Sequence, residues 1–254
     1  NAALDLAFFN NRLMITAEGY ISKTRDLLLT VQTASATGYT SRYANIGKTS
    51  NKGVELSIES RNIVRPKFSW TTNLTIAHNK QNVDDIGSED FVKGYPLNAL
   101  WGFKYGGTWK SVEEFERNSV TNTYVSALAI NSDAASRKAS LGMPRYYDIN
   151  NDGSLNNDDL VYQGNADPDL YGGLQNNFRF GRLNVGIYFT YSLGGKIYNY
   201  SELYMAGSSM SNQYRYMLEA WHPVRNPQSN LPRAGAVDAH VPSDLMIYDA
   251  SYIR

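Results

Sequence analysis

Strict alternation of apolar and polar residues is the feature that most constrains how this chain can fold. Within 182–192, one face of an extended chain carries Leu183, Val185, Ile187, Phe189 and Tyr191. A period of two places successive side chains on opposite faces of a β-strand. The same pattern, in places weaker, predicts six strands over 2–9, 12–24, 53–61, 67–79, 170–180 and 182–192. The sequence therefore predicts an all-β fold.

The connections between these strands alternate regularly between short and long. Short joints fall at Asn10 and Asn11, across 62–66, and at Gly181, whereas 26–50, 80–169 and 193–249 are long. Outer-membrane barrels have short periplasmic turns and long extracellular loops, while a soluble sandwich has no reason to keep this order. Because six strands leave two open edges, the pattern predicts an antiparallel transmembrane β-barrel fragment, an arc of a larger cylinder with long extracellular loops.

Aromatic residues gather at the end of the strands where the joints are short. They are Phe8, Phe9, Phe68, Trp70, Phe178 and Phe180. Such a cluster is typical of the aromatic girdle at a membrane interface. The alternative is that aromatic residues simply favour strands.

Composition excludes several classes of function. The chain has 254 residues and a formal net charge of zero, which argues against a broadly basic nucleic-acid binder. It contains no cysteine and three scattered histidines, and no apolar run is long enough for a membrane-spanning helix. Neither a G-x-S-x-G nor a P-loop nor an H-E-x-x-H motif occurs, so we expect no enzyme. The chain begins at Asn1 without an initiator methionine, and we interpret it as a piece of a longer protein.

The segment 148–159 matches the twelve-residue spacing of a calcium-binding loop. The candidate ligands are Asp148, Asn150, Asp152, Ser154 through its carbonyl group, Asn156 through a water, and Asp159. Calcium needs such a ring because it is a hard cation that takes six to eight oxygen ligands. Gly153 at the sixth position permits the sharp turn that the loop requires.

The calcium loop departs from the usual pattern in two ways: a shorter closing residue weakens its two-oxygen closure, and the missing helix argues against a sensor or buffer role. Asp159 stands where a longer glutamate usually closes the site, and Pro144 with the residues after it leaves no room for an incoming helix. We therefore predict a structural calcium ion rather than a sensor. The alternative is a metal-free cluster of Asx turns.

An aromatic run within 101–109 offers weak candidates for substrate binding. Trp101, Tyr105 and Trp109 carry rings of the kind that stack on sugars. The same residues suit a β-hairpin that packs inside the loop, and we favour that packing.

Several blocks along the chain, in a fixed order, resemble one family. The resemblance is to the C-terminal barrel portion of SusC/RagA-type TonB-linked outer-membrane proteins of Bacteroidetes. It runs nearly end to end and is weakest over 115–140. The blocks are Phe8-Phe9-Asn10-Asn11-Arg12-Leu13, 45–47 with 51–56, 70–80, 94–97 with 109–111, 164–173, 221–233 and 249–254.

This resemblance implies a 22-stranded barrel in the cell outer membrane, filled by an N-terminal plug. The whole of 1–254 would then be a partial barrel domain, with 81–169 as an extracellular loop region that contains the calcium-type loop. The family works with a SusD-like surface lipoprotein as a lid, draws energy from TonB, and imports oligosaccharides or, in some members, peptides. The plug, the TonB-contacting segment and the final strands would lie outside this chain.

Two other functions stay open at this point. One is a soluble extracellular carbohydrate-binding β-domain that calcium stabilises. The other is a siderophore-type TonB-dependent receptor that works without a lid. A soluble domain would be monodisperse without detergent, and a lidless receptor would purify without a lipoprotein.

Overall fold

The computed structural model describes residues 1–34, 36, 38–85, 92–128, 133–205, 212–236 and 241–254. The chain divides into two compact units. Unit one comprises 1–99, 165–196 and 249–254, and unit two comprises 100–164 and 197–248. The predicted loop region 81–169 therefore contributes to both units, and its residues 86–91 and 129–132 lie outside the described part.

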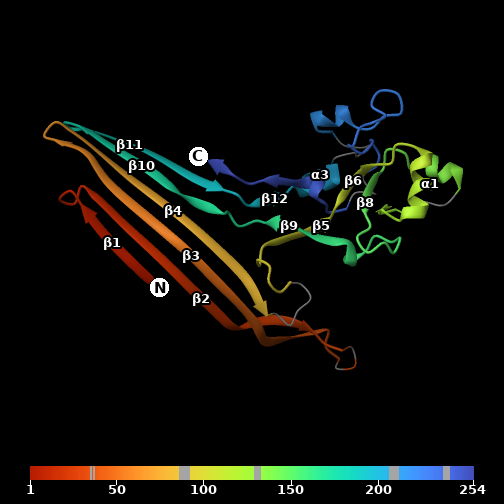
Figure 1. The fold of residues 1–254 in the computed structure, drawn as a ribbon, viewed down its shortest axis with the longest axis horizontal. Coiled ribbons are helices and arrows are strands. Elements are labelled where there is room, and N and C mark those ends of the chain that lie inside the picture. Colours follow the sequence, from red (N-terminus) through yellow and green to blue (C-terminus); the bar gives the residue numbers. More distant parts are fainter. Residues whose placement is uncertain (35, 37, 86–91, 129–132, 206–211, 237–240) are drawn as a thin grey trace. The chain divides into compact units, whose positions relative to one another are not determined.

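Unit one is a seven-stranded antiparallel sheet whose long strands lie side by side (Figure 1). All six predicted strands are present, and a short seventh strand pairs with the last of them. In spatial order the strands are β1 (Ala2–Phe8), β2 (Leu13–Gln32), β3 (Ser41–Arg65), β4 (Phe68–Asp85), β10 (Leu170–Phe180), β11 (Leu183–Leu193) and β14 (Tyr252–Ile253).

The short connections follow from residues that tolerate tight turns. Asn10 and Asn11 have φ angles of 54° and 61°, in the left-handed region that asparagine visits more readily than most residues. Between β3 and β4 the turn lies at Pro66 and Lys67, because β3 continues to Arg65 instead of ending near the predicted joint at 62–66. Proline suits this turn because its φ angle is fixed and it has no N–H group to pair.

The prediction of a long loop over 26–50 is wrong. Strands β2 and β3 stay paired from Leu27 opposite Gly47 to Gln32 opposite Ser41. A bulge interrupts the pairing between Thr24 and Leu27. Three successive leucines, Leu27 to Leu29, interrupt the alternation in this segment, but the ladder depends on backbone hydrogen bonds and does not need a strict alternation.

Unit two is a small mixed structure. Its three sheets pair β6, β8 and β7 in that order, β5 with β9, and β12 with β13. Among the described residues, no helix is both long and apolar enough to cross a membrane. The strands are β5 (Ala99–Phe103), β6 (Tyr105–Thr108), β7 (Tyr124–Val125), β8 (Pro144–Tyr147), β9 (Leu160–Asn165), β12 (Lys196–Tyr198) and β13 (Ile247–Asp249). The helices are α1 (Val112–Thr121), α2 (Ala134–Ala139), α3 (Tyr200–Met205) and the 3-10 helices Asn157–Asp159, Arg215–Glu219 and Asp244–Met246.

The core of unit two forms around Trp109, whose side chain is almost completely buried. Its ring stacks on Phe115 of α1, with 4.1 Å between ring centroids. The guanidinium group of Arg145 lies over the rings of Trp109 and Tyr124, at 5.3 and 4.2 Å from their centroids. Arg145 also forms an ion pair with Glu114 at 3.0 Å. This side chain therefore joins β8 to α1 by both charge and stacking.

Candidate functional site

One face of the sheet in unit one carries a band of apolar residues across its middle. Directly paired residues form a row across six strands, from Leu6 through Ile15, Ile58, Leu74 and Leu174 to Phe189. The ends of this row are open, since Leu6 is 39% exposed and Phe189 is 44% exposed. An apolar surface of this extent marks contact with a membrane or with another protein.

The opposite face of the same sheet is polar. The adjacent row runs from Asp5 through Thr16, Ser57, Thr75 and Gly173 to Thr190. A hollow of about 360 Å³ lies on this face between β2, β3, β4, β10 and β11, and Glu18, Glu55 and Tyr188 are among the residues that line it. The two carboxylates sit directly opposite each other on neighbouring strands. This arrangement suits a surface that faces water or polar groups, because like charges in such a pair repel.

Four of the six aromatic residues expected to gather, Phe68, Trp70, Phe178 and Phe180, lie together at the short-turn end of the apolar face. Phe68 pairs with Phe180 and Trp70 with Phe178, with ring centroids 5.0 and 5.7 Å apart. The indole N–H of Trp70 donates a hydrogen bond to the side-chain oxygen of Asn176 at 3.0 Å. A ring that is apolar on its face and bonded at its N–H is typical of a side chain at a membrane–water interface.

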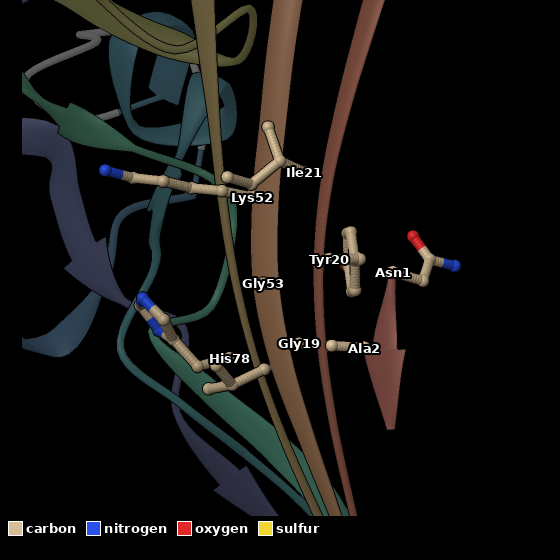
Figure 2. Close-up of a pocket in the computed structure, with 9 residues that line it drawn as sticks. Asn1, Ala2, Gly19, Tyr20, Ile21, Lys52, Gly53 and His78 are labelled. Carbon is tan, nitrogen blue, oxygen red and sulfur yellow. The ribbon is translucent and has the colours of Figure 1, made fainter. Parts of the chain in front are cut away.

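A second hollow in unit one lies beside the start of β1 (Figure 2). Tyr20 and Gly53 line it, and the side chains of Lys52 and His78 reach away from Tyr20. Strand β1 pairs with β2 only as far as Ala2, whereas β2 continues to Gln32. The hollow is therefore an open strand edge, and we assign it no ligand.

In unit two, the loop 148–159 closes on itself through its own side chains. The carboxylate of Asp148 accepts hydrogen bonds from the backbone N–H groups of Asp152 at 3.2 Å and Gly153 at 2.7 Å. Gly153 adopts a φ angle of +81°, in the left-handed region that glycine enters without strain. The sixth position of the loop thus makes the turn that the calcium pattern requires.

Asp159 closes the loop from its far end. Its side chain is completely buried, and its two oxygens accept hydrogen bonds from the N–H groups of Ile149 at 2.7 Å and Asn156 at 3.0 Å. Asn156 in turn caps the 3-10 helix that contains Asp159. These reciprocal bonds form a capping box, which fixes the position of the carboxylate at the twelfth place.

Asp152 is the most exposed of the three loop carboxylates that the calcium pattern selects. It accepts hydrogen bonds from the side-chain amides of Asn150 and Asn156, at 2.8 and 2.9 Å, and from the backbone of Ser154. The bond from Asn150, followed by those from Ser154 and Asn156, lowers the pKa of Asp152 below its ordinary value. The charged form of Asp152 is therefore the form that the loop favours.

The loop fits calcium in the type of its ligands, because its selected carboxylates are hard oxygen donors and two of them, Asp148 and Asp159, are buried. Neither of these two has a cation within ion-pair distance in the described part of the chain. The described residues contain no group of three or more acidic, histidine or cysteine side chains placed to hold a metal ion. Calcium binding by this loop stays a prediction.

The three aromatic candidates for substrate binding are packed within unit two. Trp109 donates its indole N–H to Ser126 at 2.7 Å, and Trp101 meets Tyr162 edge to face at 5.8 Å. Tyr105 donates its hydroxyl to a backbone carbonyl and lies 6.0 Å from the ring of Tyr146. Sugar stacking by the three residues stays a prediction.

The expected hairpin within 101–109 is wrong, although the packing role agrees with the structure. Strand β5 pairs with β9 and strand β6 with β8, so the two strands of the aromatic run do not pair with each other. Their partners lie later in the chain, where the alternation of the sequence is too short to indicate a strand.

Sequence reasoning missed a buried carboxylate in unit two. Glu202 is only 5% exposed and lines a cavity of about 270 Å³. The hydroxyl of Tyr216 donates to its carboxylate at 2.9 Å, and that of Tyr248 lies 2.7 Å from both carboxylate oxygens. No sequence signal points to this group, because a single glutamate in a short helix carries no motif.

Comparison with known proteins identifies relatives along nearly the whole chain. Residues 1–199 match the family described as TonB dependent receptor-like, beta-barrel. TonB-dependent receptor P26 of Formosa agariphila is 30% identical over 271 residues, which cover 99% of this chain and 26% of that receptor. TonB-dependent receptor SusC of Bacteroides thetaiotaomicron is 34% identical over 91 residues, which cover 35% of this chain and 9% of that protein.

A solved structure agrees with this family in fold. The structure of the RagAB peptide transporter matches with a TM-score of 0.74 at 20% identity, over 99% of this chain and 27% of the matched chain. This chain spans about a quarter of the length of the first curated relatives. The family match over 1–199, the relatives and the shared fold lead to one conclusion: the chain belongs to the TonB-dependent receptor-like β-barrel family of outer-membrane proteins.

Proposed function

We propose that this chain forms part of the wall of a SusC-like importer in the outer membrane, which takes up oligosaccharides or peptides with energy from TonB and with a SusD-like lipoprotein as its lid. The observation that carries this proposal is the single-layer sheet, apolar on one face and polar on the other. A transport function also agrees with the family to which the chain belongs.

The apolar face needs a cover, and lipid is the cover that fits it. The row from Leu6 to Phe189 crosses six strands, and the aromatic pairs Phe68–Phe180 and Trp70–Phe178 lie at one end of the same face. A membrane barrel places apolar side chains outward and polar side chains inward, with aromatic residues at the interfaces. The open sheet edges require further strands, because unpaired backbone groups are costly inside a bilayer.

The polar face would then line the lumen. Its hollow between Glu18, Glu55 and Tyr188 would meet water, the plug or passing cargo. In the proposed mechanism the lid delivers cargo from the cell surface, the plug rearranges, and the cargo enters the periplasm. Transport of this kind needs positioning and binding but no catalytic group in the wall.

Uptake by whole cells tests the transport proposal. Cells that carry the full-length protein should accumulate a labelled oligosaccharide or peptide, and cells that lack it or lack TonB should not. Accumulation that persists without TonB would contradict the proposal. Equal uptake with and without the lipoprotein gene would instead favour a lidless receptor.

We propose separately that the loop 148–159 binds one calcium ion with a structural role. The support is the spacing of Asp148, Asp152 and Asp159 together with the turn at Gly153. The selected carboxylates are hard oxygen donors of the kind that calcium prefers, and two of them, Asp148 and Asp159, are buried. Calorimetric titration of the full-length protein with calcium tests this proposal, and the absence of a binding isotherm would contradict it.

A further inference from the structure

The cavity beside Glu202 has the carboxylate at one end and apolar side chains along its walls. Its walls are formed by Met217, Leu231, Pro232, Leu245 and Met246, with Tyr216 and Tyr248 beside the carboxylate. The volume of about 270 Å³ lies just below the range of small-molecule sites. A single side chain therefore fits this cavity better than a chain of sugar rings.

The carboxylate of Glu202 has hydrogen-bond donors but no opposite charge. Both tyrosine hydroxyls donate to it, and no cation lies within ion-pair distance among the described residues. A buried charge is costly unless it is paired as well as hydrogen-bonded. The tyrosine bonds reduce this cost, but the charge itself is left for a ligand to neutralise.

The pKa values of Tyr216 and Tyr248 are raised by burial and by the neighbouring carboxylate of Glu202. Burial, then the hydrogen bond to Glu202 and its charge, raises the pKa of Tyr248 to about 12. The same causes in the same order raise the pKa of Tyr216 above its ordinary value. Both hydroxyls therefore stay protonated at neutral pH, where each keeps free lone pairs that can accept a hydrogen bond.

We infer that this cavity binds a lysine side chain of a peptide cargo. The ammonium group has three donors, which match the carboxylate of Glu202 and the lone pairs of Tyr216 and Tyr248. The aliphatic stem would lie along the apolar walls. Lysine fits better than arginine, because Tyr248 already contacts both carboxylate oxygens and leaves no free edge for a two-pronged guanidinium contact.

This inference rests on the proposed function in one respect, because it takes the cargo to be a peptide that meets unit two before uptake. It goes further by naming the side chain and the group that recognises it. The exposure of Tyr216 and Tyr248, at 37% and 44%, indicates that the carboxylate end of the cavity is within reach of a ligand from solvent.

Peptide binding to the purified full-length protein in detergent tests the inference. The probe is Ala-Lys-Ala with an acetylated N-terminus and an amidated C-terminus, and the matched probe has norleucine in place of lysine. We expect calorimetry to detect the lysine peptide and to give an affinity at least about tenfold weaker for the norleucine peptide. Equal affinities, or no binding of the lysine peptide, would overturn the inference.

Three variants locate the binding in this cavity. Glu202→Gln keeps the shape of the side chain and removes its charge, so binding of the lysine peptide should fall at least about tenfold. Glu219→Gln makes the same chemical change at an exposed residue of the same unit and should bind as the wild type does. Met217→Trp fills the cavity without touching the charge, and it should abolish binding even if Glu202→Gln fails to fold.

The outcome for this cavity is separable from the outcome for transport. Peptide binding in detergent requires neither TonB nor the lid. A failure to bind the lysine peptide would therefore leave the proposal of TonB-dependent uptake standing. Conversely, if the protein binds the lysine peptide but supports no uptake, the inference about the cavity stands and the proposed importer function is contradicted. Unchanged binding in both Glu202→Gln and Met217→Trp would place the peptide elsewhere and overturn the inference.

Discussion

Tyr20 of β2 lies directly across from Gly53 of β3, and its ring occupies the space that a side chain at Gly53 would need. A Cβ atom at this position would lie 2.6 Å from both Cζ and the hydroxyl oxygen of Tyr20. The tyrosine hydroxyl reaches further and donates to Asn79 of β4 at 3.2 Å. One glycine thus lets a single aromatic ring join three neighbouring strands.

The substitution Gly53→Ala should destabilise the sheet by about 1–3 kcal/mol, because the added methyl group would lie 2.6 Å from the ring of Tyr20 and 2.8 Å from the backbone oxygen of His78. Chemical unfolding of the full-length protein in lipid vesicles measures this loss. Gly19→Ala is the matched control, since no atom lies within 4 Å of a Cβ placed there. Equal losses in the two variants would mean that these close contacts do not set the cost of a methyl group at Gly53.

If the proposed wall is right, the substitution Leu174→Arg should cost about 2–4 kcal/mol in a bilayer, because it places a charge in the middle of the apolar row from Leu6 to Phe189. Leu174 pairs with Leu74 on one side and Phe189 on the other. Gln175→Arg changes the next residue, on the polar face, and should cost little. Refolding titrations into lipid vesicles compare the two, and a larger loss for Gln175→Arg would reverse the assignment of the faces.

Asp152→Ala should remove calcium binding by the loop 148–159, since it deletes the carboxylate at the fifth position. Asp158→Ala is the control, because its carboxylate is not among the selected ligands although it carries the same charge. Calcium titration of the full-length protein by calorimetry distinguishes the two variants. Calcium uptake that survives in Asp152→Ala and disappears in Asp158→Ala would contradict the ligand assignment.

Tyr248 should ionise near pH 12 in the folded protein, and Glu202→Gln should lower this value towards the ordinary value of 10. The pKa is raised on folding, so its contribution to stability is complete below pH 10 and is lost as the pH rises through about 12. Ultraviolet difference titration of the wild type against Tyr248→Phe isolates this step. An unchanged midpoint in Glu202→Gln would show that the carboxylate does not contribute.

The parts of the fold that the sequence predicts are those that depend on local pattern. Strands β10 and β11 follow the alternation on both sides of Gly181, and the predicted bounds differ from the observed ones by at most one residue. The extensions of β2 and β3 carry no such pattern. They form because backbone groups pair across the hairpin, for example at Leu28 and Asn45, whatever side chains they carry.

The candidate sites also differ in whether their contacts are local in the sequence. The closed shape of the loop 148–159 can be predicted from spacing alone, because its hydrogen bonds join residues that are close in sequence. The contacts of Glu202 reach Tyr216 and Tyr248, which lie 14 and 46 residues further along the chain. Only the folded structure brings these three side chains together, so no local pattern could identify them.

The most direct test of the importer is to isolate the full-length protein from its own host. A tagged copy would be extracted from outer membranes in mild detergent, and its partners would be identified by mass spectrometry. The proposed function predicts recovery from the outer membrane together with a stoichiometric SusD-like lipoprotein. Recovery from the membrane without that partner would contradict the lid, and recovery only in the soluble or secreted fraction would contradict the membrane-spanning wall itself.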